Sequence, residues 1–164
     1  MEVLCASPWV PVEWIAAHGI SALGAWSAIG EPAGAVPEGV CAFAQAMAGI
    51  AGASSTQAII LTTACDQMRR AADVSAARIF LFNLPATWQS PAPRRLYHAE
   101  LERLGKFLVS LGGHAPTASE LIEVMERFEQ RRDCLRVFCQ HSSARKGAED
   151  RKSTRLNSSH GYIS

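Results

Sequence analysis

Apolar and polar positions divide the chain into short β-branched runs and longer segments with helical spacing. The short runs indicate buried strands, because a strand covered on both faces needs no polar alternation. We expect strands at Val3–Cys5, in at least the first half of Ile20–Ile29, at Ile59–Thr63, and from Arg78 up to Pro85. The last of these should end at Pro85, because a proline has no N–H to donate to a sheet ladder.

The segments between these runs place apolar residues three or four positions apart, which predicts helices. Four are expected, at Val12–His18, Ala42–Ala51, Asp66–Ala77 and Arg94–Leu111. Gly30–Gly39 contains several glycines and prolines and should form a loop.

A last helix should begin at a cap formed by Thr117 or Ser119. Its apolar residues are expected to face inward: Leu121, Ile122, Met125 and Phe128. Cys134 and Cys139 should lie near its end, more readily as buried thiols than as metal ligands.

Alternating strands and helices predict an α/β fold, a three-layer domain with a parallel sheet of the flavodoxin or Rossmann kind, followed by C-terminal helices. Ile59–Thr63 and Ile79–Phe82 should be adjacent parallel strands, because one short helical crossover joins them. Residues 1–140 form this domain. Residues 141–149 are expected to be a linker, or the start of a part that this chain lacks.

Residues 150–164 are polar and aperiodic, and Asp150 to His160 resembles one reading frame of a common sequencing adapter. We therefore expect a non-native tail that makes no core contacts, and a truncated chain. A native flexible tail is the alternative.

Composition sets limits on the class of protein. A hydrophobic content of 48% with 19% charged residues is typical of a globular chain. The net charge of +1 gives no footprint for nucleic acid, and no apolar run reaches the length of a membrane span. Five cysteines without a secretion signal indicate reduced thiols in the cytoplasm. A Walker loop, a Gly-x-Gly-x-x-Gly fingerprint and a Gly-x-Ser-x-Gly elbow are all absent from the sequence.

Two cysteines carry the candidate chemistry. Cys65 lies where a predicted strand leads into a helix, which is the carboxyl edge of a parallel sheet, where ligands usually bind. Backbone N–H groups at a helix start favour a thiolate, which can attack a substrate or hold a metal. Cys41 precedes another helix, 24 residues earlier, so the two thiols can converge. The alternative is that each packs as a small apolar residue.

The segment Thr62 to Arg70, with Cys65 at its centre, resembles the cysteine signature of the 2-hydroxyacyl-CoA dehydratase D-component family, which includes benzoyl-CoA reductase subunits. Val40–Ala44 is similar to the family's first cluster-cysteine segment, and Pro11–Gly19 to its opening helix. Ile79–Pro85 and the helix Glu100–Leu111 also fit. The resemblance covers residues 1–140.

The resemblance implies that Cys41 and Cys65 hold a [4Fe–4S] cluster in an oxygen-sensitive, anaerobic enzyme, with a third cysteine ligand far downstream. The substrate would be an acyl-CoA thioester and the partners a homologous second subunit and an ATP-hydrolysing activator that donates electrons. In the dehydratases, one electron converts the thioester carbonyl to a ketyl radical, which expels the leaving group. In the benzoyl-CoA reductases, the electrons reduce a ring instead. This fragment alone should be inactive, and the resemblance assigns it no catalytic side chain.

Other readings stay open. A cluster-free α/β interaction module would need its cysteines only for packing, and thiol redox chemistry at Cys65 lacks a Cys-x-x-Cys motif. The pairs Arg69–Arg70 and Arg94–Arg95 could meet a CoA phosphate, although a solvated helix face explains them as well. The helix dipole explains Glu13, to which we assign no catalytic role. His18, His98 and His114 are expected at the surface or at helix caps.

Overall fold

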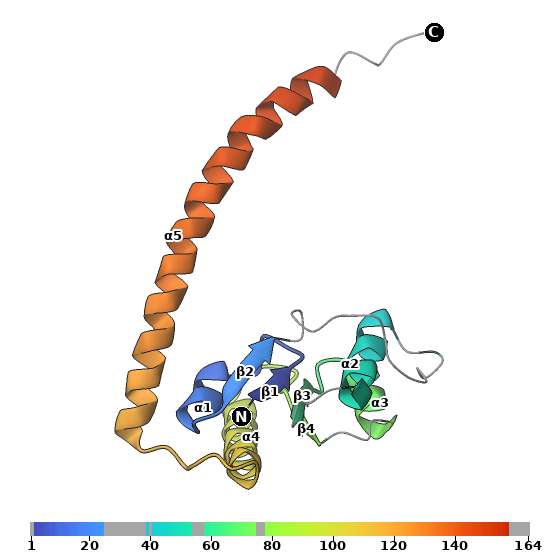
Figure 1. Ribbon diagram of the computed structural model, residues 1–164, viewed down its shortest axis with the longest axis vertical. Helices are drawn as coiled ribbons and strands as arrows, with labels where there is room; N and C mark the ends of the chain where they lie inside the picture. Colours follow the sequence, from blue (N-terminus) through green and yellow to red (C-terminus); the bar gives the residue numbers. More distant parts are fainter. Residues whose placement is uncertain (1, 25–38, 40, 54–57, 75–77, 158–164) are drawn as a thin grey trace. The chain divides into compact units, whose positions relative to one another are not determined.

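Four short parallel strands form one sheet in the order β2-β1-β3-β4 (Figure 1). The computed structural model describes residues 2–24, 39, 41–53, 58–74 and 78–157. Within them the strands are β1 (Glu2–Cys5), β2 (Ser21–Gly24), β3 (Ala58–Thr62) and β4 (Ile79–Phe82). Ile59 lies opposite Ile79, so the prediction that β3 and β4 are adjacent parallel strands is confirmed.

Helices cover both faces of the sheet. On one face lie α1 (Val12–Ala17) and α4 (Pro91–Ser110), and on the other lie α2 (Ala42–Ala53) and α3 (Asp66–Val74). Successive strand residues point to opposite faces, so β1, β3 and β4 each supply both cores. This arrangement confirms the predicted three-layer α/β fold.

The two cores differ in their side chains. The core under α1 and α4 contains the aromatic pair Phe80 and Phe82, packed with Leu104 and Leu108. The core under α2 and α3 is smaller and is built on Leu4, Ile59 and Leu61 with Met47 and Met68. All five residues of β3 are buried, which explains why its sequence is continuously apolar.

Helix α4 begins at Pro91, three residues before the predicted start. Ser90 occupies the N-cap position in an extended conformation, and Pro91 opens the first turn. A proline is well accommodated there because the first turn has no intrahelical partner for its missing N–H.

The chain divides into two compact units, Met1–Leu121 and Ile122–Ser164. Helix α5 (Ala118–Asn157) is capped by Thr117, whose hydroxyl accepts the Glu120 N–H while the Glu120 carboxylate accepts the Thr117 N–H. The helix continues well past Cys139, so the predicted end near the two cysteines was wrong.

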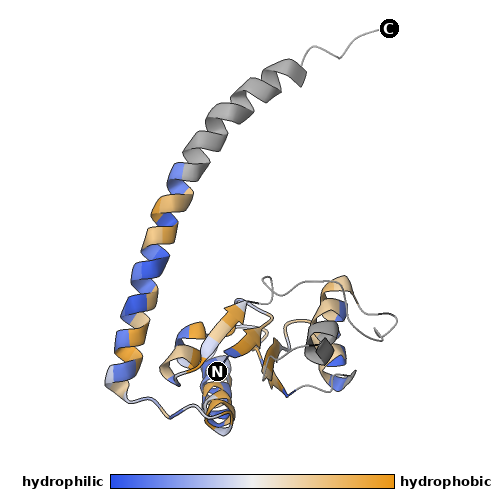
Figure 2. Cartoon of the chain, viewed as in Figure 1, coloured by the Kyte–Doolittle hydropathy of each residue, from blue (hydrophilic) through white to orange (hydrophobic). Residues whose placement is uncertain are grey.

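The predicted inward face of α5 is also partly wrong. Ile122 and Met125 are exposed, as are the thiols of Cys134 and Cys139, which we expected to be buried. The described part of the second unit is α5 alone, and a single helix has no partner layer within its unit to cover an apolar stripe. Polar and apolar residues are interspersed along the described part of this helix (Figure 2).

Some predicted segments lie outside the described residues. They are the second half of the Ile20–Ile29 run, the loop Gly30–Gly39 except for Gly39, the end of the Asp66–Ala77 helix, and residues 158–164 of the tail. No helix in the part of the chain that the structure describes is long and apolar enough to cross a membrane.

Candidate functional site

The carboxyl edge of the sheet holds the candidate site. From β1 the chain continues through α1 to β2 on one side, and from β3 it continues through α3 to β4 on the other. Because α1 and α3 cover opposite faces, the neighbouring strands β1 and β3 form a topological switch point. Open α/β sheets bind ligands in the crevice outside such a point.

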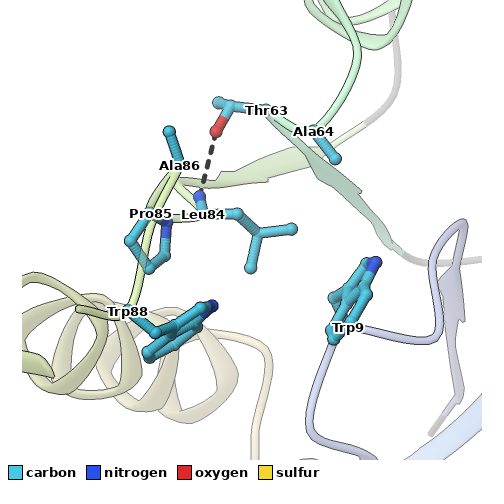
Figure 3. A pocket seen from close by; sticks show the side chains of 7 residues that line it. All are labelled: Trp9, Thr63, Ala64, Leu84, Pro85, Ala86 and Trp88. Carbon is cyan, nitrogen blue, oxygen red and sulfur yellow. Dashed lines mark hydrogen bonds between the residues drawn. The ribbon is translucent and has the colours of Figure 1, made fainter. Parts of the chain in front are cut away.

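A pocket of about 260 Å³ lies at this edge (Figure 3). Its lining comes from the loops after three strands: Trp9 after β1, Thr63 and Ala64 after β3, and Leu84, Pro85, Ala86 and Trp88 after β4. The Leu84 side chain lies between the two indole rings. The pocket therefore combines two aromatic walls with an aliphatic one.

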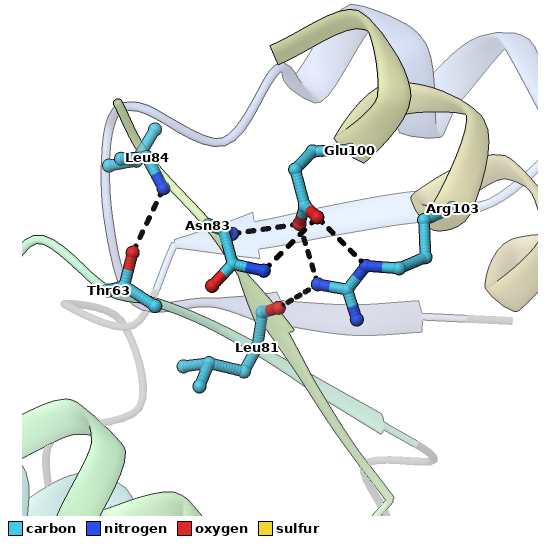
Figure 4. A network of polar contacts seen from close by, with 6 residues as sticks. All are labelled: Thr63, Leu81, Asn83, Leu84, Glu100 and Arg103. Atoms are coloured by element: carbon cyan, nitrogen blue, oxygen red, sulfur yellow. Dashed lines mark hydrogen bonds and ion pairs between the residues drawn. The ribbon is translucent and has the colours of Figure 1, made fainter. Parts of the chain in front are cut away.

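Hydrogen bonds join the loops that form the pocket. The Leu84 N–H donates to Thr63 Oγ1 at 3.0 Å, which ties the loop after β4 to the loop after β3. The next residue towards β4, Asn83, donates its N–H and its side-chain amide to the Glu100 carboxylate on α4 (Figure 4). The pocket wall is thus fixed to a neighbouring strand end and to a helix.

Glu100 is a buried charge, with only 6% of its surface exposed. Burial alone would raise its pKa, but hydrogen bonds from Arg103 and Asn83 outweigh that effect and hold the pKa of this carboxyl below its usual value. The Arg103 guanidinium also donates to the Leu81 carbonyl and lies over the Phe80 ring, 4.3 Å from its centroid. The carboxylate is therefore held ionised as a structural anchor.

Cys65 directly follows Ala64 of the pocket lining and directly precedes α3. Cys41 directly precedes α2. The Cys41 N–H donates to Gln67 Oε1 in the first turn of α3 at 3.2 Å, so the starts of the two helices lie side by side. Both thiols are exposed. The structure thus brings the segments of the two predicted site residues together at the carboxyl edge.

Two exposed cysteines at adjoining loop ends suit a soft metal or an iron–sulfur cluster, which proteins bind through thiolates. No group of three or more metal-binding side chains of the His, Cys, Asp or Glu type forms within the described residues. Cys5 does not add to the pair, because it is packed in the core and burial raises its pKa to about 12. The chain as described therefore offers two ligands.

The paired arginines occupy different environments. Arg69 lies 3.5 Å from Asp66 in an exposed pair on α3, and Arg95 is exposed on α4. Arg94 lines a second pocket, of about 270 Å³, with Trp88, Gln89, Ser90 and Pro91. Trp88 is therefore shared by both pockets.

His18, His98 and His114 lie outside this site: none of them lines the pocket or adjoins the two cysteines. His98 and His114 are exposed beside Glu102 and Glu120, as expected for surface residues. His18 caps the end of α1 as predicted, but it is buried rather than at the surface. Burial lowers its pKa against the opposing effect of its hydrogen bond to the Trp14 carbonyl. Packing of α1 against Gly105 of α4 encloses the ring.

Sequence reasoning missed the tryptophan pocket and the Glu100 network. Trp9 and Trp88 stand in loops directly after strands that we had located, and Asn83 directly follows β4. Large aromatic and amide side chains just beyond parallel strand ends were the available signal. Glu100 gave no such signal in the sequence, because its position on α4 looks like that of an ordinary surface carboxylate.

The chain matches the model of a known protein family. The family model described as "2-hydroxyglutaryl-CoA dehydratase, D-component" matches residues 9–149, which include Trp9, Cys41, Cys65 and Trp88. None of the curated proteins matches the chain.

Proposed function

Because the chain belongs to the 2-hydroxyglutaryl-CoA dehydratase D-component family, we propose that it forms part of an enzyme that dehydrates a 2-hydroxyacyl-CoA and that Cys41 and Cys65 hold its [4Fe–4S] cluster. Membership of this family implies a dehydratase-type subunit, an acyl-CoA substrate and a partner component. The cluster, its ligands and the electron chemistry are our proposal.

One observation carries the assignment of the ligands. The two cysteines precede different helices, and the bond from the Cys41 N–H to Gln67 Oε1 places those helix starts together. Gln67 follows Cys65 by two residues, so this contact fixes one thiol segment relative to the other. Both thiols are exposed and are therefore available to a cluster.

The donor chemistry also fits. Thiolates are the usual ligands of [4Fe–4S] clusters, and hydrogen bonds and burial around them tune the potential. When bound, such a cluster supplies single electrons to the thioester carbonyl. The contribution of this chain is ligation by Cys41 and Cys65, and orientation of the substrate by the loops of the carboxyl edge.

The remaining components follow from the same family. We propose a homologous second subunit as the partner component, an ATP-hydrolysing activator as electron donor, and the cytoplasm as the location. Two ligands alone should hold a cluster weakly, so we expect the isolated chain to be inactive. The family description favours dehydration over ring reduction.

Anaerobic reconstitution of the 164-residue chain with ferrous iron, sulfide and a small thiol tests the ligands, because the small thiol can fill positions that the chain leaves open. We expect bound iron and sulfide with broad visible absorbance. Cys41→Ser and Cys65→Ser should each lose most of both. Cys134→Ser is the matched control, since it removes an exposed thiol from α5, and it should behave like the parent chain.

A further variant tests the contact between the helices. Gln67→Leu keeps both thiols but removes the acceptor of the Cys41 N–H, so it should lower the iron content without abolishing it. Full iron content in Cys65→Ser would overturn the assignment. So would a parent chain that binds no more iron than the Cys41→Ser, Cys65→Ser double variant, and the result would then favour the cluster-free module.

A further inference from the structure

We propose that the pocket between Trp9 and Trp88 binds an uncharged, apolar acyl group of the CoA thioester and disfavours an acyl group that ends in a carboxylate. This inference rests on the proposed function for its acyl-CoA substrate. It adds the class of acyl group, which the family description does not fix for this chain.

The lining sets the chemistry. None of the seven residues that line the pocket carries a charge, and Thr63 is the only one with a polar side-chain group apart from the indole N–H groups. The Thr63 oxygen already accepts the Leu84 N–H. A terminal carboxylate placed here would lose water without gaining a cationic partner, which is costly. A hydrocarbon chain has no hydrogen bonds to water to lose on entering the pocket.

Exposed aromatic area supplies the driving force. Trp9 is 64% exposed and Trp88 is 50% exposed, although each indole borders the same pocket. A hydrocarbon chain between them would remove apolar surface of both rings and of Leu84 from water, and that transfer is favourable in proportion to the area buried. The tryptophans are thus explained better as the walls of a binding site than as core residues.

Trp88 is held in place before any ligand arrives. Its ring packs edge-on against Tyr97, with centroids 5.4 Å apart, and Tyr97 packs in the same way against Phe82 at 5.5 Å. Phe82 is fully buried at the end of β4. Because this row of rings connects the pocket wall to the core, little side-chain freedom remains for binding to remove.

The size and surroundings of the pocket match one part of a thioester. Its volume of about 260 Å³ falls below the roughly 300–1,000 Å³ typical of pockets for drug-sized ligands, so it suits an acyl group and not a whole CoA. Trp88 also lines the second pocket, which contains Arg94. Arg94 is not among the residues that line the apolar pocket, so the pocket itself offers an acyl group only uncharged surface.

Calorimetric titration of the 164-residue chain tests the inference with three probes: hexanoyl-CoA, glutaryl-CoA and free CoA. We expect hexanoyl-CoA to bind at least about tenfold more tightly than glutaryl-CoA, since the five apolar carbons bury area and the carboxylate does not. Trp9→Ala and Trp88→Ala should each weaken hexanoyl-CoA at least about fivefold and leave free CoA unchanged. Leu96→Ala, which removes an exposed apolar side chain of α4 outside the pocket, is the control and should change nothing.

The outcomes separate the two proposals. Equal or tighter binding of glutaryl-CoA, or unchanged hexanoyl-CoA affinity in both tryptophan variants, would overturn the acyl inference while an acyl-CoA substrate still stands. No binding of any thioester or of CoA would count against the proposed substrate itself, and the inference would fall with it. Trp9→Ala should keep the parent's unfolding midpoint, because Trp9 is 64% exposed, and Trp88→Ala, which loses the contact with Tyr97, should still unfold in one cooperative transition; these transitions verify that both variants are folded.

Discussion

Replacing Glu100 by alanine should destabilise the first unit more than any other single change to a charged side chain described here. The carboxylate accepts four hydrogen bonds, two from Asn83 at 2.9 and 3.1 Å and two from Arg103 at 3.1 and 2.6 Å. Alanine would leave these donors without their acceptor. The Arg103 side chain is 47% exposed and can turn to water, whereas Asn83 is only partly accessible at the end of β4.

The magnitude follows from the burial of the pair. Breaking a fully buried ion pair costs about 3–5 kcal/mol, and leaving a single buried hydrogen-bond donor unsatisfied costs about 1–3 kcal/mol. Since only one partner here is fully buried, we expect Glu100→Ala to lower the free energy of unfolding by about 2–4 kcal/mol in urea denaturation. The exposed control is Glu102→Ala, two residues along α4, which breaks only a surface pair with His98 and should cost about 0–1 kcal/mol.

Acid should reduce the difference in unfolding free energy between the parent chain and Glu100→Ala. The pKa of Glu100 is lower in the folded chain than in the unfolded chain, so its ionised form stabilises the fold at neutral pH. That contribution is lost as the pH falls from the usual pKa of a glutamate to and below the lower pKa of Glu100 in the folded chain. The gap between the parent and Glu100→Ala should therefore narrow over this interval. A cost below about 1 kcal/mol at neutral pH, or a gap that widens in acid, would refute the reasoning.

Three further changes test the packing around the site. Leu104→Ala empties a fully buried position on α4 and should cost about 2–5 kcal/mol in urea denaturation, against less than about 1 for the exposed Leu96→Ala. Thr63→Val removes the acceptor of the partly buried Leu84 N–H and should cost about 1–3 kcal/mol. The control Thr87→Val loses only an exposed 3.4 Å contact and should cost less than about 0.5 kcal/mol. Equal costs for the two variants would contradict the role of the bond between the loops. Gly105→Ala places a methyl 3.0 Å from the buried histidine ring of α1, so the unfolding midpoint should fall despite alanine's better helix propensity, and a rise would show that the ring can move aside.

The sequence was sufficient for the architecture, because the strands of a three-layer fold are buried on both faces and read as unbroken apolar runs. Ile59–Thr63 is such a run, and β3 lies where it was expected. Strand ends in a parallel sheet lie at one edge, so the placement of Cys65 before α3 could also be predicted. Cys41 was placed before α2 because it follows the predicted loop Gly30–Gly39 and opens a segment with helical spacing.

Contacts between distant segments could not be read from local patterns. The approach of Cys41 to Gln67 depends on how α2 and α3 pack, and the pocket depends on three loops that are far apart in sequence. Periodicity also overestimated burial on α5, since an apolar stripe is covered only where another layer exists. Glu100 looks like a surface residue in sequence, and only the packing of α4 against the end of β4 buries it.

The position of Arg103 bears on how the molecule avoids aggregation. β4 is the outermost strand of the sheet, and the carbonyls of Arg78, just before β4, and of Phe82 accept hydrogen bonds from the N–H groups of Ile59 and Thr63 on the β3 side. The Leu81 carbonyl, one residue from Phe82, therefore points to the open side of the strand, where a second molecule could add its own strand. Arg103 occupies that acceptor with a half-exposed cation. An incoming strand would have to displace the guanidinium and bring its backbone beside a charge. The side chain that holds Glu100 ionised therefore also disfavours edge-to-edge association of the sheet.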